Sequence, residues 1–162
     1  MVGVFGACIG ASVDMIAACD VVYAAKNAFF SIKEIDLGVT TDLGTLNRLP
    51  IMTSNWSLLK ELALTGQQFG PSEARDIGLI SRTFETQEEM EKALFKLADF
   101  IAQKSPLAII GVKKVLNHVR SKQVEQGLEF VGLWNMSQIF TGDIKESVTA
   151  MLTKRKPNFQ KL

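Results

Sequence analysis

The sequence has few of the residues that build metal sites, disulfide frameworks and cysteine nucleophiles. Its 162 residues include one histidine, His118, and two cysteines, Cys8 and Cys19. Both cysteines lie among apolar residues without a Cys-x-x-Cys spacing, and His118 is far from them in the sequence. We therefore expect no metal site, no disulfide and no Cys-His nucleophile. We interpret the cysteines as small core residues in a reducing compartment.

An excess of one charge and long apolar runs are also absent. Lysine and arginine number 18 against 17 acidic residues, a net charge of +1, so nothing global favours nucleic acid or an anionic membrane as a partner. No apolar run approaches the ~20 residues that cross a bilayer. Apolar residues still make up 47% of the chain, enough for a sizeable core in one domain.

The chain opens with an apolar run at residues 2–5, which predicts a buried strand with no lead-in. Natural domains seldom begin inside their own core. We therefore expect that an N-terminal part of the fold is absent from this chain.

Strand patterns are few and short. Gly6 and Gly10 frame a predicted tight turn into a helix that starts near Ser12, a good N-cap residue. β-Branched and aromatic residues predict strands at 20–25, 29–33 and 79–84, with a turn at Lys26-Asn27 and a loop at 34–41.

Helical patterns dominate the rest of the chain. Helices are predicted at 43–50, at 53–64 with Gly66 as its stop, at 71–77, and from a Thr86 capping box to about 104. Ser105-Pro106 opens the last third, where three helical stretches are expected, separated near Arg120 and Gly142. Their apolar face runs through Leu128, Val131, Trp134 and Phe140. Few strands followed by many helices indicate an α/β fold with a helical C-terminal region.

Asp14 lies in a helix that has almost no polar face, so that helix should be buried all round. A buried, unpaired carboxylate is unfavourable by several kcal/mol or becomes protonated, and it therefore needs a partner or a function. Two interpretations stay open: backbone N–H groups at the helix start satisfy Asp14, or Asp14 belongs to a site.

Glu34 and Asp42 stand on either side of a glycine-containing loop after an apolar strand, a common place for site residues. Alternatively, Glu34 pairs with Lys33 in solvent and Asp42 caps a helix beginning at Leu43. Asp36 is a nearby competitor for a role in the site.

Gly10 and Ala11 add a different group, because small residues let a ligand approach the backbone there. N–H groups at a helix N-terminus can stabilise a developing oxyanion. Neither GxGxxG nor GxxxxGK[ST] is present at this turn, so a nucleotide site has little support.

Taken together, these segments resemble the crotonase, or enoyl-CoA hydratase/isomerase, superfamily over essentially the whole chain. Residues 6–14 are similar to its oxyanion-hole turn and helix, and residues 29–38 and 42–50 to its second and third site segments. Later similar stretches are Ser105-Pro106 through Lys113, Trp134-Asn135-Met136-Ser137, and 154–157 with Phe159. The resemblance implies the C-terminal portion of a crotonase spiral fold. Residues 1–104 would form a partial spiral core carrying the acids, and 105–162 a helical oligomerisation region.

Three side chains separate the reactions within that family. Hydratases typically carry glutamates where Asp14 and Glu34 stand and a glycine where Asp42 stands, whereas dienoyl-CoA isomerases carry Asp, Glu and Asp. The resemblance therefore implies an isomerase that converts 3,5-dienoyl-CoA to 2,4-dienoyl-CoA in fatty-acid β-oxidation. Glu34 and Asp42 would be the acid and base pair, in an order that the sequence leaves open, and Asp14 would orient the site. Ala11 and Gly10 would bind the enolate oxygen. No cofactor is implied, since coenzyme A is part of the substrate.

Two departures from the family bear on activity. Ala11 and Ser12 stand where glycines are usual, and the segment that supplies the first oxyanion N–H has no counterpart here. Loss of one of two donors would lower the rate about 10²- to 10³-fold. A hydratase and a non-catalytic remnant that only oligomerises are the alternative functions.

The resemblance also implies an acyl-CoA thioester as substrate and assembly into a homotrimer or a dimer of trimers. Lys113 and the basic residues 154–156 either contact the CoA phosphates or are solvated helix-end charges. Gln160-Lys161-Leu162 resembles the Ser-Lys-Leu peroxisomal address but departs from it at the first position. A peroxisomal or mitochondrial location is expected.

Overall fold

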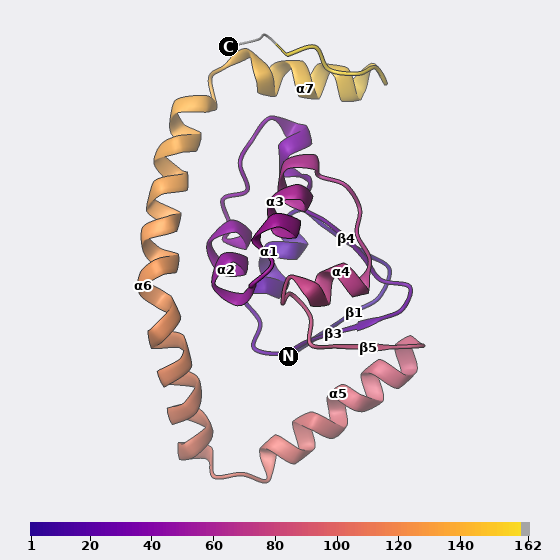
Figure 1. Ribbon diagram of the computed structural model, residues 1–162, viewed down its shortest axis with the longest axis vertical. Coiled ribbons are helices and arrows are strands. Elements are labelled where there is room, and N and C mark those ends of the chain that lie inside the picture. The colour runs from indigo at the N-terminus through magenta and orange to yellow at the C-terminus, as the bar shows by residue number, and fades with distance from the viewer. Residues whose placement is uncertain (160–162) are drawn as a thin grey trace.

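The computed structural model describes residues 1–159 (Figure 1). The strands are β1 (Val2–Val4), β2 (Ala7–Ile9), β3 (Val22–Ala25), β4 (Phe29–Ser31) and β5 (Arg82–Phe84). The helices are α1 (Ala11–Ala17), the 3-10 helix η1 (Lys33–Leu37), α2 (Thr45–Met52), α3 (Trp56–Thr65), α4 (Pro71–Asp76), α5 (Gln87–Ala102), α6 (Pro106–Gln138) and α7 (Gly142–Leu152). The predicted α/β class is confirmed.

The strands form two small parallel sheets, one ordered β1-β3-β5 and one pairing β2 with β4. The chain visits both sheets in β1 and β2, passes through α1, and visits both again in β3 and β4. Val4 lies beside Ala24 in the first sheet, and Cys8 lies beside Phe30 in the second. Each turn of the chain therefore stacks on the previous one, which is the spiral that the resemblance implied.

The core lies between these sheets and helices α1 to α4. All four residues of β3 are buried, as expected for a strand covered on both faces of a parallel sheet. The rings of Phe30 and Phe69 stack with centroids 5.6 Å apart, where the two residues form an isolated antiparallel bridge. The Ser31 hydroxyl, also buried, donates to the Gly66 carbonyl at 2.7 Å. The contacts of Phe30 and Ser31 therefore hold the end of β4 in place, and η1 begins directly after it.

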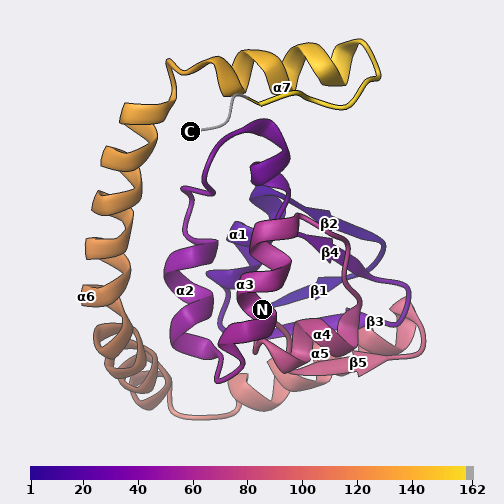
Figure 2. The same ribbon diagram turned by 45° about the horizontal axis from the view of Figure 1, so that its top comes forward.

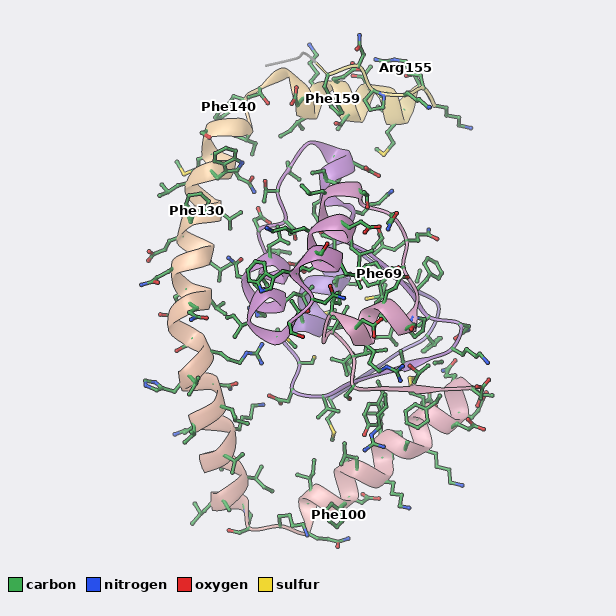
Figure 3. All side chains as sticks on the ribbon, in the orientation of Figure 1. Phe69, Phe100, Phe130, Phe140, Arg155 and Phe159 are labelled. Carbon is green, nitrogen blue, oxygen red and sulfur yellow. The ribbon has the colours of Figure 1, made fainter. Side chains whose placement is uncertain are left out.

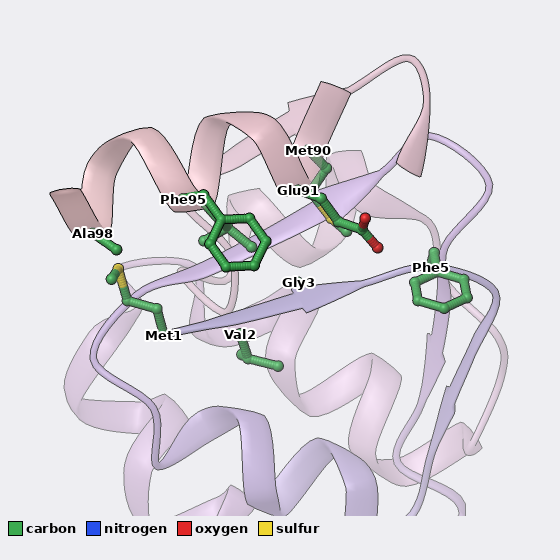
Figure 4. Close-up of a pocket in the computed structure, with 9 residues that line it drawn as sticks. Met1, Val2, Gly3, Phe5, Met90, Glu91, Phe95 and Ala98 are labelled. Carbon is green, nitrogen blue, oxygen red and sulfur yellow. The ribbon is translucent and has the colours of Figure 1, made fainter. Parts of the chain in front are cut away.

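Helices α5, α6 and α7 frame this core on three sides (Figures 1 and 2). Helix α5 covers the β1-β3-β5 sheet, where Met90 is buried against Tyr23 and Ala25. Beside it, β1 and α5 line an apolar groove of about 570 Å³ in which Phe95 lies over the strand (Figure 4). None of the three predicted site acids lines this groove. Among residues 1–159, no helix is long and apolar enough to span a membrane.

Several local start and stop signals are confirmed. Gly66 ends α3 in a left-handed conformation, Thr86 accepts a hydrogen bond from the Glu89 N–H, and Ser105 accepts one from the Ala108 N–H.

The segment between Gly6 and Gly10 was predicted wrongly. It is a strand, β2, and not a tight turn. The first residue of α1 is Ala11, its N-cap is Gly10, and the Ser12 hydroxyl donates to the Ile9 carbonyl. Pairing with β4, about twenty residues later, decides this conformation, and local turn propensity does not report such pairing.

The last third also differs from prediction. Helix α6 continues through Arg120, where a break was expected, and the three helical stretches are two. The Arg120 guanidinium contacts the Met52 sulfur, so α2 lies against the expected break. On the predicted apolar face Val131 is buried, whereas Trp134 is 50% exposed and Phe140 96% exposed. Figure 3 shows Phe130 on α6 and Phe140 just beyond the C-terminal end of that helix.

Candidate functional site

Asp14 is buried on α1, and its carboxylate is fully engaged with the following loop and helix. The Thr45 backbone N–H donates to Oδ1 at 2.6 Å, and the Thr41 hydroxyl donates at 3.2 Å from either carboxylate oxygen. Thr45 is the first residue of α2, so Asp14 satisfies one of the N–H groups that every helix N-terminus leaves unpaired. The negative charge also lies at the positive end of the α2 dipole.

This geometry corrects two of the interpretations above. The N–H that satisfies Asp14 belongs to α2 and not to the start of its own helix. Helix α2 begins at Thr45, and its N-cap residue is Gly44, which has no side chain to form a capping hydrogen bond. Asp42 therefore does not cap a helix starting at Leu43. The capping role falls to an acid 31 residues earlier in the chain.

Glu34 lies on η1 with its carboxyl group turned towards the start of α1. A Cβ atom added at Gly10 would lie 3.2 Å from Glu34 Oε1, and Gly10 has φ +59°, a conformation that glycine adopts without strain. Glu34 Oε2 is buried, and no donor in the part of the chain that the structure describes reaches it. Burial raises the pKa of Glu34, and the negative charges of Asp14 and Asp42 raise it further, against the opposing backbone hydrogen bonds from Glu34 itself and from Lys33.

The alternative pairing of Glu34 with Lys33 is wrong. The Lys33 ammonium forms its ion pair with Asp36, an exposed i,i+3 partner on the same 3-10 helix. Asp36 is thereby engaged on the solvent side of η1, which weakens it as a competitor for a role in the site.

Asp42 is exposed in the loop before α2, and its Oδ2 accepts a hydrogen bond from Asn135 Nδ2 on α6 at 3.3 Å. The charge of Asp42 acts on Glu34, as does that of Asp14. The fold thus brings the three predicted acids, which lie on three different segments, into one electrostatic cluster. Asp14 is the buried member, Glu34 is half-buried and Asp42 is exposed.

The N-terminus of α1 adjoins this cluster. Ala11, the first helical residue, is exposed, and the amide N–H of a first helical residue has no acceptor within its own helix. The Gly10 N–H is already used, because it donates to the Ser31 carbonyl at 2.9 Å. Of the two predicted oxyanion residues, Ala11 is therefore the one whose N–H is placed to bind an oxyanion. Gly10 instead provides the turn and the space for the Glu34 carboxyl group.

Two apolar cavities flank the acids. One of about 430 Å³ is bounded by α1 and α2 and is lined by Ala11, Asp14, Met15 and Leu43 among others. The other, of about 490 Å³, lies between α2 and α6 and is lined by Thr40, Thr41, Phe130, Val131 and Trp134 among others. Walls that are mostly apolar and include a few polar groups are typical of sites for small apolar ligands.

The basic candidates lie elsewhere. Lys113, near the start of α6, forms an exposed ion pair with Asp20 at 2.7 Å. In the 154–156 cluster, Arg155 binds the Glu146 carboxylate through both terminal nitrogens. Gln160, Lys161 and Leu162, the predicted address signal, lie outside the described residues.

Sequence reasoning missed three residues that organise the site, namely Thr41, Thr45 and Asn135. The threonines lie beside Asp42, yet nothing local indicates that their donors point to Asp14. Asn135 was noted only as part of a stretch that resembles the family. An amide side chain between Trp134 and Met136 on an amphipathic helix was the one available signal.

Comparison with known proteins places this chain in a family. The enoyl-CoA hydratase/isomerase family matches residues 2–161. The chain is 47% identical over 159 residues to the peroxisomal Delta(3,5)-Delta(2,4)-dienoyl-CoA isomerase of Arabidopsis thaliana, covering 98% of this chain and 57% of that protein. It is 43% identical over 152 residues to the mitochondrial enzyme of that name from Mus musculus, covering 94% of this chain and 46% of that protein.

The fold comparison agrees. An enoyl-CoA hydratase/isomerase from Pseudoalteromonas atlantica superposes with a TM-score of 0.90 at 28% identity, covering 99% of this chain and 64% of that one. The chain spans about half the length of the curated relatives it matches. On both the sequence and the structural match, the chain belongs to the enoyl-CoA hydratase/isomerase, or crotonase, family.

Proposed function

We propose that this protein is a dienoyl-CoA isomerase of fatty-acid β-oxidation, which converts 3,5-dienoyl-CoA to 2,4-dienoyl-CoA. The observation that carries the proposal is the division of the acids. Asp14 is engaged by α2, whereas Glu34 has a buried oxygen that no donor among the described residues reaches, and Asp42 is exposed. Two carboxyl groups are therefore available for proton transfer, as the reaction requires. The relatives described above carry the name of this activity.

The reaction removes one proton from C2 and adds one at C6, so the double bonds move without a change in composition. Loss of the C2 proton gives an enolate conjugated with the diene, and its oxygen carries the negative charge. Protonation at C6 then restores the neutral thioester. One carboxyl group must begin ionised and the other protonated.

We assign Glu34 to C2 and Asp42 to C6. The thioester oxygen would bind the Ala11 N–H at the N-terminus of α1, and C2 is bonded to the thioester carbon. Glu34 Oε1 lies at this same turn, beside Gly10, whereas Asp42 lies beyond it in the loop. A carboxylate with a raised pKa is also the stronger base towards a C–H bond.

The remaining parts of the substrate would lie along the surfaces described above. The apolar cavities beside Asp14 and beside Thr41 would hold the acyl chain. Lys113 would leave its ion pair with Asp20 and bind a CoA phosphate instead, since a phosphate is a stronger partner than an exposed carboxylate. No cofactor is required, because the reaction transfers only protons.

Assembly and location follow the same proposal. The relatives named above are peroxisomal and mitochondrial, and we propose one of these two compartments. We also propose a homotrimer or a dimer of trimers, to which exposed apolar side chains of α6, such as Phe130, would contribute. Sedimentation of the purified chain tests this assembly.

The test follows 3,5-dienoyl-CoA by the absorbance of the conjugated 2,4-dienoyl thioester. The isomerase is supported if the chain turns over 3,5-dienoyl-CoA and if Asp42→Asn lowers the rate about 10²- to 10⁴-fold. Asp36→Asn is the matched control, because Asp36 lies in the same region but is tied to Lys33 on the surface. Water addition to crotonyl-CoA would instead indicate a hydratase. Silence with both substrates would indicate a non-catalytic remnant.

A further inference from the structure

The side chain of Asn135 joins α6 to the loop that carries Asp42. Asn135 Nδ2 donates to the Thr40 carbonyl at 2.8 Å, and the Thr40 N–H donates to Asn135 Oδ1 at 3.4 Å. The same Nδ2 donates to Asp42 Oδ2 at 3.3 Å. One amide group thus contacts both backbone polar groups of Thr40 and the carboxylate two residues later.

This arrangement restricts the loop more than a single hydrogen bond would. Two hydrogen bonds to the backbone of one residue restrict both the position and the orientation of the peptide groups around Thr40. From the opposite side, the hydroxyl of the next residue, Thr41, donates to Asp14. Asp42 therefore follows a segment that is held from α6 on one side and from α1 on the other.

The Asp42 carboxylate has particular need of such support, because it is exposed. An exposed aspartate samples several rotamers, and proton transfer needs the acid and the accepting carbon in near-contact geometry. The hydrogen bond from Asn135 Nδ2 favours the rotamer in which Oδ2 faces α6. The other oxygen, Oδ1, then remains for the substrate.

We propose that Asn135 is a positioning residue for Asp42, so that α6 is a working part of the reaction site as well as a surface for assembly. This inference rests on the proposed isomerase function. It assigns a role in catalysis to the region 105–162, for which the sequence predicted oligomerisation and, as one of two alternatives, a contact of Lys113 with the CoA phosphates.

The competing explanation is that Asn135 only attaches α6 to the core. Attachment predicts a loss of stability with no specific effect on Asp42. Positioning predicts a loss of kcat that depends on the presence of the Asp42 carboxylate. The two explanations therefore differ in a double-mutant cycle between Asn135 and Asp42.

The experiment measures kcat, KM and thermal unfolding of the whole chain with 3,5-dienoyl-CoA. Asn135→Ala is expected to lower kcat about 10- to 100-fold, the range for a misplaced catalytic group, with little change in KM. In the Asp42→Asn background the same change should leave the residual rate unaltered. Asn117→Ala, an exposed substitution of the same kind on the same helix, is the control and should match the wild type.

Asn135→Asp provides a second, nearly isosteric variant. It keeps an acceptor for the Thr40 N–H but places a carboxylate against Asp42 and the Thr40 carbonyl. Its activity relative to wild type should rise as the pH falls, because a protonated Asp at position 135 can again donate. If Asn135→Ala does not fold, this ratio decides the question.

Wild-type kcat in Asn135→Ala, or an equal loss in the Asp42→Asn background, would overturn the positioning role alone. A flat pH ratio for Asn135→Asp would do the same. A wild-type chain without turnover would overturn the proposed function, and the role of Asn135 with it.

Discussion

Replacing Asp14 by alanine removes the acceptor for two buried donors, the Thr45 N–H and the Thr41 hydroxyl. Loss of an N-cap interaction lowers stability by about 0.5–2 kcal/mol. Each buried donor left without an acceptor lowers it by about 1–3 kcal/mol. These contributions overlap, because the N-cap bond is one of the two, and the loop can relax towards water. We therefore expect Asp14→Ala to reduce the free energy of unfolding by about 3 kcal/mol.

Such a loss is a large fraction of the roughly 5–15 kcal/mol that stabilises a typical domain. For a chain of this length it corresponds to a fall in Tm of about 6–12 °C. Asp14→Asn keeps an oxygen acceptor for the Thr45 N–H and loses mainly the charge at the α2 N-terminus, so about 1 kcal/mol is expected. Urea denaturation, followed by circular dichroism, measures the free energy of unfolding of both variants.

Asp99→Ala is the matched control, since Asp99 is exposed on α5 and its removal should change stability by no more than about 0.5 kcal/mol. The reasoning is refuted if Asp14→Ala unfolds with the control. It is also refuted if Asp14→Asn is as unstable as Asp14→Ala, because the hydrogen-bond acceptor would then not be the origin of the effect.

Three further predictions concern Glu34, Gly10 and Phe30. Glu34→Gln should lower turnover about 10²- to 10⁴-fold. Because the folded state raises the pKa of Glu34, the wild type loses stability as the pH rises from the ordinary value of 4.5 through the folded-state pKa. Urea denaturation should therefore find Glu34→Gln more stable than wild type at neutral pH and equal to it in acid. Gly10→Ala meets both a φ of +59° and Glu34 Oε1 at 3.2 Å, so we expect a loss of about 1–2 kcal/mol, and an unchanged Tm would contradict this. Phe30→Ala empties a fully buried site stacked on Phe69 and should lower the free energy of unfolding by about 3–5 kcal/mol, measured by the same denaturation.

The features that the sequence predicted well are local ones. Gly66 ends α3 because glycine, which lacks a Cβ, adopts the left-handed conformation without strain. Thr86 caps the N-terminus of α5 because its hydroxyl accepts a hydrogen bond from the Glu89 N–H three residues later. The β-branched and aromatic residues at 20–25 predicted a strand, and β3 forms there at Val22–Ala25. The resemblance to a family also pointed to the acidic trio as site residues, and that assignment stays a prediction. For Gly66 and Thr86, the determining atoms lie within a few residues of one another.

Tertiary structure decided the features that depend on distant segments. The strand β2 exists through its pairing with β4, and Asp14 is satisfied by a helix that begins 31 residues later. Asn135 reaches Thr40 across 95 residues. A side chain with several potential donors and acceptors within reach has no preferred partner until packing excludes water from all but one. The sequence by itself therefore determined which acids this protein carries. Only the packing of α1, α2 and α6 decided that α2 holds Asp14 and that Asn135 on α6 reaches Asp42.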